Sequence, residues 1–139
     1  MAGLSIAGLG VAAGGWILAL AASSSAPAAP QIFTKSQVKA GQQVFLAHCA
    51  VCHGYQLQGK IGPALKGPAF ADVWLTGKQN ADSLFYVIST QMPFNAPGSL
   101  KTSQYLEALS YILSQNGLVP GKTAMTVALL KKTTLPKAP

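Results

Sequence analysis

The sequence predicts an all-α fold of three to five helices joined by long loops. Apolar residues recur at helical spacing in several segments, and no segment shows the alternation of a half-buried strand. The segments between them are punctuated by glycine and proline, of which the chain has 14 and 9. A chain of 139 residues suits one compact domain. Loops this long in so small a domain need support, which a large buried prosthetic group would supply.

Four helical elements are predicted, and their ranges are 36–49, 70–75, 80–88 and 102–117. Three of them have boundary residues of the kind that start or stop a helix. These boundary residues are Thr34 or Ser36 for the first, Asn80 or Asp82 for the third, and Thr102 or Ser103 with Gly117 for the last. The stretch from Gly54 to Pro68 is expected to be a loop.

The first residues of the chain carry a targeting pattern. Residues 1–22 contain no charged side chain, and small residues follow, with Ala26-Pro27-Ala28 as a plausible cleavage site. We expect residues 1–28 to be an export signal or a retained membrane anchor. The chain then divides into a domain over residues 29–118 and a lysine-bearing C-terminal extension over residues 119–139. Either outcome places the domain in the periplasm, soluble or anchored to the inner membrane through residues 1–22.

The charge is carried almost entirely by lysine. The chain has ten lysines, no arginine and three acidic residues, for a net charge of +7. Nucleic-acid binding is not expected, because basic and aromatic residues are not interleaved. Three carboxylates leave little room for paired-carboxylate hydrolysis, and two cysteines cannot build a disulfide-rich scaffold. Lys60, Lys66 and Lys78 lie in predicted loops, where they either steer docking to an acidic partner or only keep the surface soluble.

The residues that carry chemistry are Cys49-Ala50-Val51-Cys52-His53, a C-x-x-C-H motif. Two thiols at this spacing can form thioethers with the two vinyl groups of one haem, and His53 is then placed to bind the iron. Three other interpretations remain: a redox dithiol, which lacks its usual βαβ context, a zinc site, which lacks further ligands, and a plain disulfide. The motif predicts a single covalently attached haem c.

From Ser36 to about Gly117 the sequence resembles the class I c-type cytochromes, a family of small monohaem electron carriers. The resemblance rests on Gly41-x-x-x-Phe45 before the haem motif, on Gly62-Pro63-Ala64-Leu65 and on Gln91-Met92-Pro93-Phe94. It implies that the Pro63 carbonyl accepts the Nδ1–H of His53, and that Met92 is the second axial ligand of the iron.

Further packing and pocket residues follow from the same resemblance. Gly41 and Phe45 should meet Tyr105 and Leu109 where the first and last helices cross. Trp74 and Phe94, together with Tyr55 and Tyr86, are expected to line the haem pocket, and Trp74 can hydrogen-bond a haem propionate. His48 is expected to be a solvent-side neighbour of this pocket.

The class I resemblance implies a one-electron carrier, not an enzyme, because His53 and Met92 would fill both axial positions of the iron. Residues 92–117 are similar to the haem-c domains that serve quinoprotein (PQQ) alcohol dehydrogenases, which points to the electron donor. The donor would be a dehydrogenase, possibly a quinoprotein, and the acceptor a terminal oxidase or another cytochrome. Two alternatives remain open: a haem-bearing subunit fixed in a larger membrane redox complex, and a haem enzyme or gas-binding protein whose sixth position is open.

Overall fold

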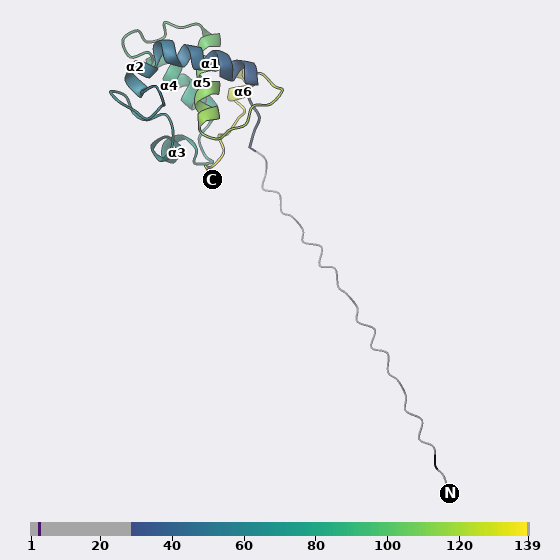
Figure 1. Cartoon of the computed structure of the whole chain (residues 1–139). Helices are drawn as coiled ribbons and strands as arrows, with labels where there is room; N and C mark the ends of the chain where they lie inside the picture. Colours follow the sequence, from purple (N-terminus) through teal and green to yellow (C-terminus); the bar gives the residue numbers. More distant parts are fainter. Residues whose placement is uncertain (1–2, 4–28, 139) are drawn as a thin grey trace.

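The computed structural model describes Gly3 and residues 29–138 (Figure 1). The described residues form six helices: α1 (Lys35–His48), α2 (Ala50–His53), α3 (Pro68–Trp74), α4 (Ala81–Gln91), α5 (Thr102–Gln115) and α6 (Val127–Leu130). The predicted all-α class is confirmed, and the number of helices passes the expected range because α2 and α6 are separate helices of 4 residues each. The predicted leader over residues 1–28 lies outside the described residues, apart from Gly3. None of the helices in the described part of the chain combines the length and the hydrophobicity needed to cross a bilayer.

Capping side chains fix the beginnings of α1 and α4. The Thr34 hydroxyl accepts the Gln37 N–H at 3.2 Å, and the Gln37 side-chain oxygen accepts the Thr34 N–H at 3.2 Å. The Asn80 side-chain oxygen accepts the Asp82 N–H at 2.7 Å. Each side chain satisfies an amide that has no partner inside its helix, so Thr34 and Asn80 are the caps among the predicted candidates. At its other end α4 continues beyond the predicted Ile88 to Gln91.

α1 and α5 cross at close range in the centre of the fold (Figure 1). Gly41 on α1 lies against the backbone of α5, where a Cβ would overlap the Glu107 carbonyl and approach the Tyr111 Cβ to 3.0 Å. The atoms nearest to Gly41 therefore belong to Glu107 and Tyr111 and not to the predicted Tyr105 and Leu109. Phe45 packs its ring 5.4 Å from that of Tyr111 and shares one core cluster with Tyr105 and Leu109.

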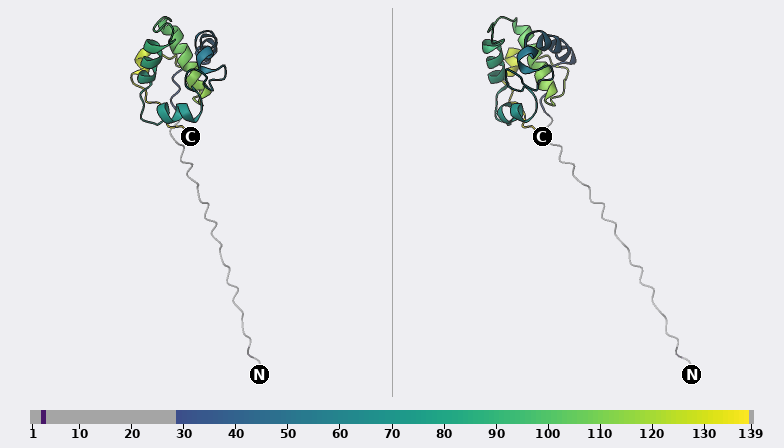
Figure 2. Two further views of the ribbon diagram at one scale, coloured as in Figure 1. Left: turned by 90° about the vertical axis from the view of Figure 1, so that its left-hand side faces the viewer. Right: turned by 60° about the vertical axis from the view of Figure 1, so that its left-hand side comes forward.

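The C-terminal residues 119–138 pack along the helices. Met125 is only 2% exposed, and its backbone N–H and C=O are both bound by the Gln37 side chain, at 2.8 and 3.1 Å. Further along, the Ala138 N–H donates to the Leu75 carbonyl at 2.7 Å, so the C-terminus lies beside α3 (Figure 2). The segment thus ties the start of α1 to the connection between α3 and α4.

Candidate functional site

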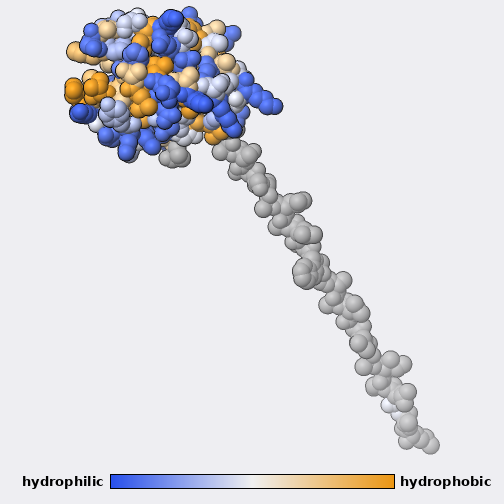
Figure 3. Space-filling view, turned by 45° about the horizontal axis from the view of Figure 1, so that its top comes forward, coloured by the Kyte–Doolittle hydropathy of each residue, from blue (hydrophilic) through white to orange (hydrophobic). Residues whose placement is uncertain are grey.

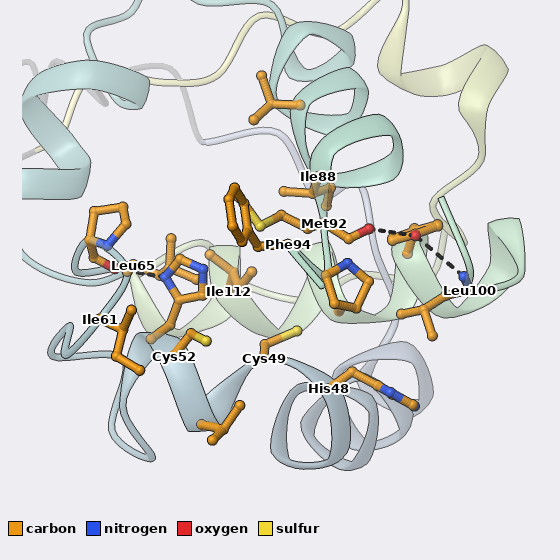
Figure 4. A pocket seen from close by; sticks show the side chains of 18 of the residues that line it. His48, Cys49, Cys52, Ile61, Leu65, Ile88, Met92, Phe94, Leu100 and Ile112 are labelled. Atoms are coloured by element: carbon orange, nitrogen blue, oxygen red, sulfur yellow. Dashed lines mark hydrogen bonds between the residues drawn. The ribbon is translucent and has the colours of Figure 1, made fainter. Parts of the chain in front are cut away.

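A cavity of about 630 Å³ opens between the α1–α2 segment and the end of α4 (Figure 4). Most of its lining is apolar, with Leu65, Leu84, Ile88 and Ile112 among the contributors, and it contains no lysine or carboxylate. This volume is typical of a cofactor or small-molecule site. Seven of the site residues predicted from the sequence line this cavity, namely Cys49, Cys52, His53, Pro63, Trp74, Met92 and Phe94.

The two cysteines lie at a break between two helices. α1 ends at His48, Cys49 leaves the helical conformation, and the chain resumes as α2. The Cys49 carbonyl accepts the N–H groups of Cys52 and His53 at 3.1 and 2.9 Å, which holds the motif in one tight turn. Cys49 and Cys52 lie on the same side of the cavity (Figure 4). Cys49 thus caps α1, one residue beyond the last helical position, and the rest of the motif forms the short separate helix α2.

The protonation of Cys49 bears on the redox-dithiol interpretation. Burial, with a smaller contribution from the neighbouring Cys52, raises the pKa of the Cys49 thiol to about 11. Reactive redox cysteines have a lowered pKa, because the thiolate is the nucleophile. The two cysteines form no disulfide with each other, and the half-buried Cys49 lacks the lowered thiol pKa of a redox nucleophile. Within the described residues, no group of three or more His, Cys, Asp or Glu side chains is arranged to hold a metal ion.

His53 is buried at 7% exposure, and its ring orientation is fixed by the loop that follows it. Its Nδ1 lies 2.7 Å from the Pro63 carbonyl oxygen. Since a carbonyl can only accept, Nδ1 is the nitrogen that donates, and in the neutral imidazole the lone pair is then on Nε2. Gly62 lies flat against the ring, where a Cβ would come within 2.8 Å of Cε1. The imidazole is thus held so that Nε2 is the ring nitrogen left to bind a metal.

The loop over residues 54–67 is held by hydrogen bonds at both ends. The N–H groups of Ile61 and Gly62 donate to the Cys52 carbonyl at 3.0 and 2.9 Å. The Asn116 side chain, at the end of α5, donates to the Leu65 carbonyl at 2.8 Å. Its own oxygen accepts the Gly67 N–H at 3.1 Å. The sequence analysis missed Asn116, because an Asn before Gly117 indicates only a helix end.

Met92 enters the cavity from the wall opposite the cysteines (Figure 4). It is the C-cap of α4, and its half-buried side chain directs its sulfur into the cavity. Its backbone carbonyl accepts the Tyr105 hydroxyl at 2.7 Å, and the same hydroxyl accepts the Leu100 N–H at 3.3 Å. Phe94 also lines the cavity, yet it is 83% exposed and stands at the mouth.

Two aromatic residues expected at the pocket do not reach it. Tyr55 and Tyr86 are 67% and 62% exposed, and neither lines the cavity. Tyr55 lies in the turn after α2, and Tyr86 lies on the outward face of α4, whose other face turns Leu84 inward. His48 is exposed and contributes to the cavity wall, so its predicted place beside the site is confirmed.

The arrangement fits a flat apolar cofactor with an iron centre. Two thiols lie on one wall, the imidazole Nε2 is available, and a thioether sulfur enters from the other wall. Nitrogen from imidazole and sulfur from Met are established axial ligands of haem iron. Every fully buried side-chain nitrogen and oxygen in the described residues has a hydrogen-bond partner.

This fold and this site define a class I c-type cytochrome. A model of the family described as "Cytochrome C oxidase, cbb3-type, subunit III" matches residues 36–112, more than half of the chain, and the protein belongs to that family. As a cytochrome c domain it carries covalent haem c, and its function is electron transfer. Cys49, Cys52 and His53 form its C-x-x-C-H motif.

Individual proteins are similar to parts of this chain. A "Cytochrome c-553-like" protein from Synechocystis sp. is 52% identical over 33 residues, which cover 24% of this chain and 31% of that protein. The crystal structure of the sulfane dehydrogenase SoxCD from Paracoccus pantotrophus matches with a TM-score of 0.56 and 26% identity, over 73% of this chain and 54% of that one. Cytochrome CL from Methylophaga aminisulfidivorans matches with a TM-score of 0.42 and 27% identity, over 58% of this chain and 53% of that one. The chain thus spans less than two thirds of the length of each relative.

Proposed function

We propose that this protein is an exported monohaem carrier that takes single electrons from a dehydrogenase and passes them to a downstream oxidase or cytochrome. The observation that carries the proposal is the set of possible haem-binding side chains that line one cavity. A histidine with a free Nε2 and a methionine sulfur both line it, together with the two cysteines. With both axial positions of an iron filled from the protein, no substrate needs to bind the metal.

Each of these residues has a distinct part in holding the haem. Cys49 and Cys52 would hold the haem through two thioether bonds, each S–H adding across one vinyl group with no leaving group. His53 binds the iron through Nε2, while its Nδ1–H donates to Pro63 at 2.7 Å. That hydrogen bond orients the ring and raises its basicity. Met92 supplies the sixth ligand from the other wall. Thioether sulfur is a soft donor, and it raises the reduction potential relative to a second imidazole.

The haem supplies an iron that cycles between the ferric and ferrous states, and the pocket residues control its surroundings. The apolar lining excludes water and lowers the local dielectric around the site. Trp74 is half-buried in the wall, and its indole N–H would donate to a haem propionate. Phe94 covers the mouth on the Met92 side.

The exposed face beside the cavity suits a protein partner. Val51, Ile61 and Phe94 line the cavity and are 60%, 79% and 83% exposed, which places apolar contact surface at its mouth. Figure 3 shows such apolar patches interrupting a mostly hydrophilic surface. Lys60 and Lys66 are exposed and flank the loop residues that line the cavity, and Lys78 is exposed after α3. We infer a redox partner with acidic groups around an apolar contact.

Two features support a dehydrogenase as the donor. The matched SoxCD structure is a sulfane dehydrogenase, and residues 92–117 resemble haem domains that serve quinoprotein alcohol dehydrogenases. The family description, an oxidase subunit, favours a second arrangement in which the chain is a fixed subunit of a membrane redox complex. In either case residues 1–28 would direct the domain to the periplasm, as a cleaved signal or as an anchor. Recovery of these residues on protein purified from membranes would favour the subunit.

The visible spectrum of the oxidised and reduced protein tests the ligand set. We expect a c-type spectrum, a weak far-red band from the thioether–iron bond in the oxidised form, and no change when carbon monoxide is added to the reduced form. A Met92→Ala variant should lose the band and bind the gas. A wild-type protein that lacks the band and binds carbon monoxide would contradict Met92 ligation, and would favour an enzyme or gas-binding protein with an open sixth position.

A further inference from the structure

A single hydroxyl group braces the segment that carries Met92. Tyr105 is only 5% exposed, and its hydroxyl donates to the Met92 carbonyl at 2.7 Å. The same oxygen accepts the Leu100 N–H at 3.3 Å. Both hydrogen bonds are visible in Figure 4, where they join the two ends of the segment over residues 92–100. Because Tyr105 belongs to the long helix α5, these bonds tie the segment to the most buried helix of the fold.

The other hydrogen bonds of this segment stay within it. The Gly98 N–H donates to the Met92 carbonyl at 3.2 Å, and the Ala96 N–H donates to the Pro93 carbonyl at 2.8 Å. The residues from 94 to 99 are all exposed. Among the described residues, Tyr105 is the side chain that joins this segment to the rest of the domain by hydrogen bonds. The Met92 backbone is therefore held by the end of α4, which it caps, and by the Tyr105 hydroxyl.

We propose that Tyr105 is the positioning residue for the sixth iron ligand, holding the Met92 backbone so that its sulfur stays at the iron. The inference rests on the proposed function, in which Met92 ligates the haem. A thioether is a neutral ligand with no charge to hold it, so its occupancy depends on how well the protein pre-positions it. A rigid helix that grips the ligand's own carbonyl gives this pre-positioning, whereas the exposed loop alone would let the sulfur move away. In the absence of the hydroxyl an outside ligand competes more effectively for the iron.

The test compares Tyr105→Phe with Tyr111→Phe in the haem-loaded protein. Tyr111 is a matched control because it lies on the same helix, is 7% exposed, and packs its ring 5.4 Å from that of Phe45. Its hydroxyl makes no hydrogen bond to the described residues. Imidazole is titrated into each oxidised protein, and the far-red band is followed. We expect Tyr105→Phe to bind imidazole about tenfold more tightly than wild type, the factor that corresponds to one lost hydrogen bond. Tyr111→Phe should stay at the wild-type affinity.

Equal imidazole affinities in wild type and Tyr105→Phe would overturn the proposal. If wild type itself lacks the far-red band, the Met92 ligation of the proposed function has failed, which is a separate result. Should Tyr105→Phe fail to fold or load haem, amide exchange in the wild type decides the matter. The Leu100 N–H should exchange at least about tenfold more slowly than the exposed Asn95 N–H, because only the former is hydrogen-bonded to Tyr105. Equal rates at the two amides would also overturn the proposal.

Discussion

Asn116 joins the end of α5 to the loop that carries the histidine's hydrogen-bond acceptor. Its side chain donates to the carbonyls of Leu65 and Ile112 at 2.8 and 2.9 Å and accepts the Gly67 N–H at 3.1 Å. Leu65 lines the cavity and lies near Pro63 in the chain. A single polar side chain therefore fixes the loop on which the orientation of His53 depends.

We expect Asn116→Ala to lower the free energy of unfolding of the haem-loaded protein by about 1–3 kcal/mol, because partly buried backbone groups lose their partners. Urea denaturation followed by the haem absorbance measures the loss. Gln115→Ala is the control, since this neighbour is also half-buried and its side chain makes no hydrogen bond to the described residues. An unfolding midpoint for Asn116→Ala equal to that of Gln115→Ala would show that the clamp does not support the loop.

The residues of the site differ in how far the sequence could predict them. Cys49, Cys52 and His53 are neighbours in sequence, so their shared chemistry is visible as a motif. Tyr105 and Asn116 act through contacts with backbone groups, which any residue carries, and the bonds of Asn116 to Gly67 and Leu65 span 49 and 51 positions. Such contacts leave no pattern in the chain. Tyr105 was therefore assigned to the helix crossing, although its hydroxyl serves the Met92 segment.

The helical segments differ in the same way: some follow from patterns of neighbouring residues, and others depend on contacts that are distant in sequence. α1, α4 and α5 follow from apolar periodicity and from caps such as Thr34 and Asn80, which act within a few residues. α6 has 4 residues, too few for a period to show. The burial of Met125 in that C-terminal segment depends on Gln37, 88 positions away. The lysines of this segment predict only its solvent-facing side, whereas its apolar side chains complete the core.

The close crossing of α1 and α5 predicts the sign of the stability change when Gly41 is replaced by alanine. In an open helix position Gly→Ala stabilises by up to about 1 kcal/mol through helix propensity. At Gly41 a Cβ would overlap the backbone carbonyl of Glu107, so we expect Gly41→Ala to destabilise by about 1–3 kcal/mol instead. Thermal and urea unfolding of the haem-loaded protein measure it. Gln42→Ala, at the exposed neighbouring position, should stay within about 0.5 kcal/mol of wild type. A stabilised Gly41→Ala would mean that the two helices do not meet at this point.

At the scale of the whole molecule, the ten lysines outweigh three carboxylates, and neither kind of residue lines the cavity. The field of the domain therefore attracts anions, while the contact surface at the mouth stays apolar. The lysines differ in position. Lys60 and Lys66 flank the loop beside the cavity. Lys131 and Lys132 follow α6, where the Lys131 carbonyl accepts a hydrogen bond from Asn80, at the opposite end of α4 from Met92.

The rate at which small inorganic complexes oxidise the reduced protein distinguishes steering by the lysines near the cavity from the effect of net charge. Ferricyanide, an anion, should react more slowly as ionic strength rises, because salt screens its attraction to the lysines within about 10 Å at 0.1 M. A cationic cobalt(III) complex should show the opposite trend. Replacing Lys60 and Lys66 by Gln should flatten the ferricyanide dependence more than replacing Lys131 and Lys132, although both double variants lose the same charge. Equal salt dependence in the two variants would mean that electrons leave without guidance from the loop lysines, and the acidic partner inferred for this face would lose its support.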